Sequence, residues 1–499
     1  MTTKVVKGSF WTLLGQILPL GASLVATPFV IRFLGTEGYG LLILVGLIPS
    51  YFGFADFGMS IASTKFGSEA YATGDGDKES RVIRTAALIT ALTATPIGVI
   101  LFLFSNFIVG LFNVPEQLQT DASFALKIAS ITFVVNFLNN IFNTPQLARL
   151  RMDLNTLVTT GFRLLGVVVT PVVLYLGGGI VGAVTVVMIA SLLTLVGHII
   201  VSRRLLPSLL GKTIDRTMTR PLLKFGRAYA ISAIAAILLG STEKLVLARA
   251  TSVKELAYYS IAFTIASMMT LFSGSMTQSL IPAFSQLQTD ELRGQRGELY
   301  SRCIRIASVG FIPALVFVAI IAKPFLTLWA GPEFGIEATV PLYILLVGLV
   351  FNAIAYFPNA MIIASGRTDI LAKVYWAELA FYIPLVFLLV SRFGARGAAA
   401  AWSIKVIVDA VILFTLVRRT VGISIGKVNL GYGAFAFGLI IMPFVLTQFF
   451  TEINSVVIAL AILAFGFYGL IVWKKFLKDE ETTWLRIRIY GFLKKMRLK

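Results

Sequence analysis

Long apolar segments alternate with short polar ones along nearly the whole chain. Since a bilayer core takes about 20 consecutive apolar residues per helix, this pattern predicts about fourteen transmembrane helices. They cover residues 10–32, 41–66, 84–111, 122–146, 157–176, 180–201, 222–248, 256–283, 304–328, 338–363, 370–390, 396–417, 430–450 and 454–473. Almost nothing is left for a soluble domain. The predicted fold class is therefore an all-α polytopic membrane protein.

The composition supports this prediction. Of the 499 residues, 57% are hydrophobic and 13% are charged, and the mean hydropathy is +0.87. Water-soluble proteins do not reach such values. The formal net charge of +19 would suggest nucleic acid for a soluble protein, but the basic residues lie at helix ends and in loops. We expect anionic phospholipids at the cytoplasmic face as partners, and no nucleic acid; the basic tail at 477–499 is expected to be interfacial.

Lys and Arg are unevenly distributed between alternate loops. If the N-terminus is inside, one face receives Lys4, Lys7, the segments "DGDKESRVIR" and "ARLRMD", and the C-terminal tail, whereas few basic residues fall on the other. Loops rich in Lys and Arg stay in the cytoplasm. Both termini are therefore predicted to be cytoplasmic.

The chain also matches itself at a shift of about 216 residues. "LFNVPE" at 111–116 lies over "LWAGPE" at 328–333, and Asn136 and Arg151 lie over Asn352 and Arg367. Six helices per copy would start both copies from the same face. This predicts two parallel repeats with a central cleft and alternating access. The predicted domains are an N lobe at 1–210, a C lobe at 211–420 and two extra helices at 421–476, followed by the tail.

The polar residues exclude several kinds of chemistry. One histidine and one cysteine form neither a metal-ligand cluster nor a disulfide, so no catalytic residue, metal or cofactor is predicted. His198 lies in the apolar run "LLTLVGHIIV" and is interpreted as a packed, hydrogen-bonded residue. A membrane glycosyltransferase or polymerase would generally carry a long outer loop or domain, but the longest outer connections here, "FNVPEQLQTD" and "WAGPEFGIE", are short.

A few charged and amide residues lie within the predicted helices. Cations there are costly and are functional candidates by default, although those near helix ends can instead snorkel to the headgroups. The predicted substrate-binding residues are Arg32, Lys65, Lys127, Lys244, Arg249, Asn136, Asn140, Asn352 and Gln278. Arg32 and Arg249 are related by the repeat. Asp56 and Glu378 are candidates for coupling to H⁺ or Na⁺, with a structural pairing as the alternative.

The order of several motifs resembles a known family. "LGTEGYG" after the first helix, "FADFG" in the second and "STEKLVLARATSVKELAYYSIA" in the seventh and eighth are similar to the oligosaccharide flippases. These are the polysaccharide transport members of the multidrug, oligosaccharidyl-lipid and polysaccharide exporter superfamily. The first helix lacks the acidic residue usual in the drug-exporting branch.

The resemblance implies a function and a location. Members move undecaprenyl-pyrophosphate-linked oligosaccharide to the outer leaflet of the inner membrane for O-antigen, capsule or exopolysaccharide assembly. The implied partners are that lipid-linked oligosaccharide, a polysaccharide polymerase and other assembly proteins. The alternatives are a lipid II type precursor flippase and a multidrug/cation antiporter of the same superfamily. Coupling to H⁺, to Na⁺ or to the membrane potential stays open.

Overall fold

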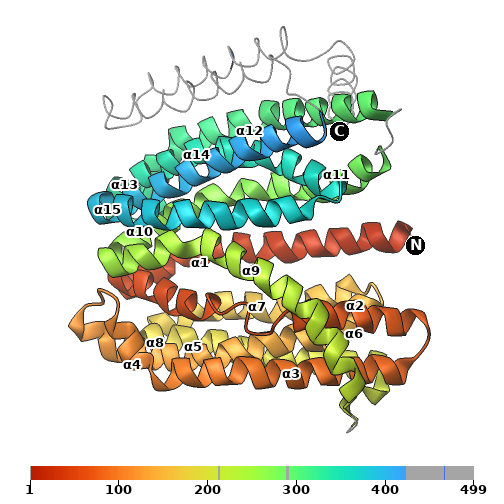
Figure 1. Ribbon diagram of the computed structural model, residues 1–499. Helices are drawn as coiled ribbons and strands as arrows, with labels where there is room; N and C mark the ends of the chain where they lie inside the picture. The colour runs from red at the N-terminus through yellow and green to blue at the C-terminus, as the bar shows by residue number, and fades with distance from the viewer. Residues whose placement is uncertain (1, 212–213, 288–291, 423–465, 467–499) are drawn as a thin grey trace, which may run out of the picture. The chain divides into compact units, whose positions relative to one another are not determined.

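The computed structural model describes residues 2–211, 214–287, 292–422 and 466 (Figure 1). Apart from residue 466, the two predicted C-terminal helices and the basic tail lie outside these residues. The described helices are α1 (Thr2–Ser50), α2 (Met59–Ala72), α3 (Gly76–Leu103), α4 (Ser105–Gly110), α5 (Glu116–Phe142), α6 (Thr144–Ala148), α7 (Met152–Tyr175), α8 (Gly179–Leu205), the 3₁₀ helix η1 (Pro207–Leu210), α9 (Arg216–Ala250), α10 (Val253–Met268), α11 (Thr270–Gln286), α12 (Arg293–Ala330), α13 (Pro332–Glu337), α14 (Thr339–Ala364) and α15 (Thr368–Thr420).

The described residues contain eight helices that are long and apolar enough to cross a membrane. The two longest each carry a break at a glycine. Gly35 in α1 has φ 71° and Gly394 in α15 has φ 55°, a region that glycine reaches without steric cost. Each break falls between two predicted helices. An all-α polytopic fold is thereby confirmed.

One predicted helix is interrupted. We expected an unbroken helix over 41–66, but α1 ends at Ser50 and α2 begins at Met59. Pro49 lacks an amide hydrogen, and after it the chain runs through tight turns whose amides bond to carbonyls three residues back, such as Phe52 to Pro49. Phe57 and Gly58 then both have positive φ. The prediction of one continuous helix here is wrong, because the length of an apolar segment does not indicate whether the helix breaks within it.

The order of helices repeats along the chain. α12 begins at Arg293, 217 residues after α3 begins at Gly76, and α15 begins at Thr368, 216 residues after α7 begins at Met152. The break of α15 at Gly394 likewise corresponds to the connection between α7 and α8. These three positions thus recur at about the shift found in the sequence.

The chain forms two compact units. The first contains the chain up to Ser260 together with Tyr375–Ala398, and the second contains Ile261–Val374 and the chain from Ala399. These units do not test the lobe boundaries predicted from the repeat. In the first unit α1 packs on α7, α5 on α8 and on α3, and α7 on α8. In the second, α14 packs on α11 and α12.

The core of the first unit joins α1, α5 and α10. Leu41, Leu44, Leu126 and Leu256 are fully buried in it. Gly40 permits this packing, because a Cβ on it would lie 1.8 Å from the Val253 carbonyl oxygen. Gly40 lies within α1, and of the glycines in "LGTEGYG" only Gly35 has a positive φ.

Ion pairs lie at helix ends of the same unit. Glu79 on α3 is fully buried and receives both terminal nitrogens of Arg149, at 2.6 and 3.0 Å. Asp215 caps α9 by accepting from the amide of Thr217 at 2.9 Å. A hydrogen bond from the Thr217 hydroxyl, more than the nearby Arg81, lowers the pKa of Asp215.

Candidate functional site

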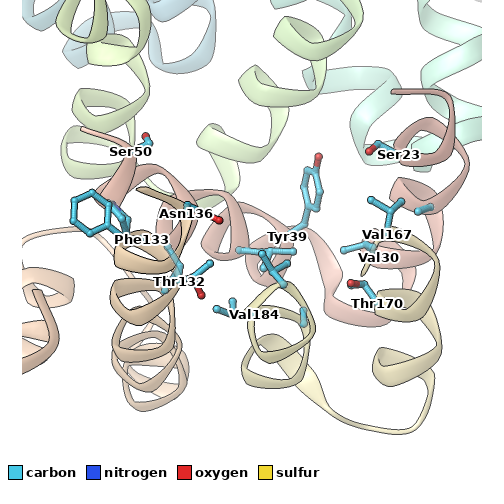
Figure 2. A pocket seen from close by; sticks show the side chains of 18 of the residues that line it. Ser23, Val30, Tyr39, Ser50, Thr132, Phe133, Asn136, Val167, Thr170 and Val184 are labelled. Carbon is cyan, nitrogen blue, oxygen red and sulfur yellow. The ribbon is translucent and has the colours of Figure 1, made fainter. Parts of the chain in front are cut away.

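A cavity of about 640 Å³ opens inside the first unit, among α1, α5, α7 and α8. Figure 2 shows its labelled side chains projecting from these helices around one common space. Its walls are mainly aliphatic and aromatic, with hydroxyl and amide groups at intervals. The polar lining residues are Ser23, Thr27, Tyr39, Ser50, Thr132, Asn136, Asn140 and Thr170.

Helical spacing places these polar groups on common faces. On α5, Thr132, Asn136 and Asn140 are four residues apart and therefore project to the same side. On α1 the Thr27 hydroxyl donates to the Ser23 carbonyl at 2.7 Å, and on α7 Thr170 donates to Gly166 at 2.8 Å. These hydroxyl protons are used within their own helices. Any further hydrogen bond of these hydroxyls must therefore be accepted by the oxygen.

A second cavity of about 420 Å³ adjoins the first. Asn136, Asn140, Val167, Thr170 and Val187 line both. The second cavity is more polar; its other lining residues are Asn139, Thr159, Arg163, Gly166, Ala190, Ser191, Thr194 and His198.

Arg163 is the charged residue of this lining, and the predicted site residues do not include it. It is the twelfth of the 24 residues of α7, so it lies at the centre of a helix that is long and apolar enough to span a membrane. A central arginine costs about 2.5–3.5 kcal/mol on insertion scales. The predicted helix began at residue 157, which placed Arg163 near an end. The acidic and polar first turn, Met152–Asn155, was the signal that would have moved it to the centre.

His198 forms a buried network at the edge of the second cavity. The Gln146 amide nitrogen lies 3.1 Å from His198 Nδ1 and donates to Ser202 Oγ at 3.2 Å, and Ser202 donates to the Phe142 carbonyl. His198 Nε2 lies 3.1 Å from the Thr159 hydroxyl. The interpretation of His198 as packed and hydrogen-bonded is confirmed, although it also lines a cavity.

The structure places the predicted cations of the N-terminal half away from these cavities. Arg32 is exposed on α1. Lys65 pairs with Glu69 at 3.6 Å and lies over the Phe66 and Phe225 rings. Lys127 lies 5.9 Å from the centre of the Phe102 ring. Of the predicted substrate-binding residues, the two cavities bring together Asn136 and Asn140.

The predicted residues farther along the chain are dispersed. Arg249 donates to the Leu111 carbonyl at 2.9 Å and so ties the end of α9 to the segment after α4. Lys244 and Asn352 are half-buried, on α9 and α14. The Gln278 side chain lies outside the described residues. Their role in binding stays a prediction.

The predicted acids differ in environment. The buried Asp56 accepts from the amide of Gly58 at 2.9 Å, from the amide of Ser60 at 3.1 Å and from the Ser60 hydroxyl. It therefore caps the first turn of α2, as carboxylates do at helix N-termini. Glu378 is buried on α15. Coupling through either residue stays a prediction.

Glu243 is a buried carboxylate that the sequence reasoning did not select. It is fully buried on α9, and it accepts from the Tyr259 hydroxyl at 3.0 Å and from the Tyr382 hydroxyl at 2.7 Å. The three residues join α9, α10 and α15. Because Tyr382 lies 139 residues farther along the chain, no local pattern could have indicated the cluster.

Comparison with known proteins places the chain in a family. Residues 5–288, more than half of the chain, match the family described as polysaccharide biosynthesis protein. The chain belongs to the polysaccharide biosynthesis protein family. The predicted kinship with polysaccharide transport proteins is thereby confirmed.

Named relatives of this polysaccharide biosynthesis family member are found in several bacteria. A Shigella flexneri protein named "Putative O-antigen transporter" is 22% identical over 422 residues, which cover 83% of this chain and 98% of the relative. A Bacillus subtilis protein, "Uncharacterized membrane protein EpsK", is 24% identical over 363 residues, 68% of each chain.

Solved structures show the fold of this family member. A lipid II flippase, MurJ, in an inward closed conformation has a TM-score of 0.72 at 15% identity and covers 95% of this chain and 100% of its own. An inward-facing multidrug resistance transporter of the MATE family has a TM-score of 0.61 at 16% identity, covering 81% of this chain and 94% of its own. The chain is a multi-pass membrane protein with the fold of these transporters.

Proposed function

We propose that the protein is a flippase for undecaprenyl-pyrophosphate-linked oligosaccharide, the repeat unit of an O-antigen, capsule or exopolysaccharide. It moves this lipid from the inner to the outer leaflet of the cytoplasmic membrane. The observation that carries the proposal is the pair of adjoining cavities, which present hydroxyls, amides and one arginine inside a unit of membrane-spanning helices. Sugar hydroxyls need such hydrogen-bonding partners, and the lipid chain can stay in the bilayer.

The comparisons support the same substrate class. The family is one of polysaccharide biosynthesis, and the name of the Shigella flexneri relative refers to O-antigen transport. The fold is that of transporters, which favours transport over an enzymatic role. The proposed partners are the lipid-linked oligosaccharide, anionic phospholipids at the cytoplasmic face, and the polymerase that would use the exported unit.

The proposed mechanism is alternating access, as the repeated helix order suggests. Both termini are cytoplasmic in this proposal. With the inside negative, moving phosphate charge outward is favoured by about 2.3 kcal/mol per charge per 100 mV. The membrane potential alone can therefore set the direction, and coupling to H⁺ or Na⁺ is the competing version.

Gene deletion tests the function. In the deletion strain we expect a lipid-linked oligosaccharide to accumulate on the inner leaflet, and the wild-type gene to restore export. Asn136→Leu removes an amide from both cavities and should reduce export several-fold, whereas Asn106→Leu, at an exposed position of α4, is the matched control. Accumulated lipid II would instead indicate a cell-wall precursor flippase. Raised drug sensitivity without any accumulating lipid would contradict the proposal and indicate an exporter.

A further inference from the structure

We propose that the smaller cavity is a binding site for a phosphate group, with Arg163 as its cation and the amides of Asn136 and Asn140 as further donors. The inference rests on the proposed function only for the identity of the carrier, a phosphate-linked lipid. The site lies entirely within the first unit and not among the cations that the sequence suggested.

The charge of the cavity selects an anion. Its lining contains no Asp or Glu, and no ion pair of Arg163 occurs among the residues that the structure describes. The Gln146 amide nitrogen can only donate, so His198 Nδ1 accepts from it and carries no proton. The imidazole is therefore neutral. Arg163 therefore gives the cavity a positive charge that no acidic residue of the lining neutralises.

The neighbouring hydrogen bonds leave donors available to a ligand in the cavity. Asn136 Oδ1 accepts from Asn139 at 3.4 Å, so the Asn136 amide nitrogen is left to donate. Since His198 Nδ1 accepts, Nε2 carries the proton and donates to the Thr159 oxygen, which leaves the Thr159 hydroxyl proton available. A guanidinium, two amides and a hydroxyl form a donor set that suits the several oxygens of a phosphate.

Acceptors for a sugar lie beside these donors. Asn139 is buried and its Oδ1 has no hydrogen-bond donor among the described residues. Thr170 and Thr194 donate to carbonyls of their own helices and therefore present oxygens as acceptors. Sugar hydroxyls next to a phosphate would satisfy them. The larger cavity continues from this point and has room for further sugars.

The size and setting of the cavity agree with this occupant. Its 420 Å³ lies within the range of about 300–1,000 Å³ that small-molecule sites occupy. Arginine is suited to the role because its planar group binds phosphate through two parallel hydrogen bonds. Arg163 is exposed on α7, so a ligand can reach its guanidinium.

Two sources could supply the phosphate: the pyrophosphate of the carried lipid or the headgroup of a bulk phospholipid. The experiment uses purified full-length protein in phosphatidylcholine nanodiscs, with undecaprenyl pyrophosphate as the probe and uncharged undecaprenol as the comparison. A second set of nanodiscs contains phosphatidylglycerol. Weaker probe binding there would identify bulk headgroups as competitors for the same site, whereas unchanged binding would identify the carried lipid as the occupant.

Variants connect binding to Arg163. Arg163→Gln should weaken binding of undecaprenyl pyrophosphate roughly 10- to 100-fold, as expected for loss of a charged hydrogen-bonded pair, and Arg163→Lys should weaken it less. Arg392→Gln, at an exposed position of α15, is the matched control and should bind as wild type. Asn140→Asp places a carboxylate in the same cavity lining as Arg163 with almost no change of shape. Asn140→Asp should also weaken binding of undecaprenyl pyrophosphate. It therefore tests the site even if Arg163→Gln folds poorly.

The outcomes separate the site from the function. Wild-type affinity in both Arg163→Gln and Asn140→Asp, or equal binding of undecaprenol and undecaprenyl pyrophosphate by the wild type, would overturn the phosphate site. The proposed function would still stand without the phosphate site if the wild-type gene restored export in the deletion strain. If binding depended on Arg163 but deletion of the gene left export unchanged, the phosphate site would be supported and the proposed function overturned.

Discussion

The buried cluster of Glu243, Tyr259 and Tyr382 allows a sharp test of what holds the first unit together. The perturbation is Tyr382→Phe, which removes a single hydroxyl. Each carboxylate oxygen of Glu243 accepts one tyrosine hydroxyl, at 3.0 and 2.7 Å. Two hydroxyl donors on its two oxygens suit the ionised, acceptor-only form of a carboxyl group.

The magnitude follows from burial and charge. All three side chains are essentially inaccessible to solvent, so water cannot replace the lost hydroxyl. A hydrogen bond to a charged group contributes about 1.5–3 kcal/mol, against about 0.5–1.5 kcal/mol for a neutral one. Tyr382→Phe should therefore lower the free energy of unfolding by about 1.5–3 kcal/mol. Tyr259→Phe should cost somewhat less, because its bond is longer.

The assay is equilibrium unfolding of the purified protein in mixed detergent micelles, followed by circular dichroism. Tyr175→Phe is the matched control, since Tyr175 is 73% exposed at the end of α7 and should change stability little. The decisive comparison repeats Tyr382→Phe in a Glu243→Gln background. In that background Tyr382→Phe should lower the free energy of unfolding by only about 0.5–1.5 kcal/mol, the range for a neutral hydrogen bond. An equal cost in both backgrounds would refute the argument from charge, and a cost no larger than that of Tyr175→Phe would refute the hydrogen bond itself.

Three further substitutions test other contacts. Gly40→Ala should destabilise the protein by about 1–3 kcal/mol through overpacking, whereas Gly46→Ala, with no atom within 4 Å of its new Cβ, should not; equal unfolding midpoints would contradict the close approach. Asp56→Asn should reduce stability by about 1 kcal/mol, because an amide nitrogen replaces one of the two oxygens that accept from Gly58 and Ser60, and export should be retained; lost export at unchanged stability would favour ion coupling instead. Glu79→Gln should cost about 3–5 kcal/mol by leaving Arg149 without its buried partner, and unfolding midpoints within error of wild type would show that water compensates the arginine.

Much of the architecture could be predicted from the sequence. Helices at the apolar segments, the breaks near Gly35 and Gly394, and the repeat at about 216 residues all depend on length and local pattern, which bilayer thickness and backbone sterics translate directly into structure. The amides Asn136 and Asn140 were also found, because residues four apart share a helix face. The predicted helices at 430–450 and 454–473 lie outside the described residues, apart from residue 466.

The site depended on packing. Arg163 and His198 meet at one cavity because α7 packs on α8, and Glu243 meets Tyr382 because α15 returns to α9. Hydrophobic length decides that a segment is a helix in the membrane, but it does not decide which face of that helix meets which neighbour. That choice is made by side-chain contacts between segments far apart in the chain, and these determine which buried charges gain partners and which face a cavity.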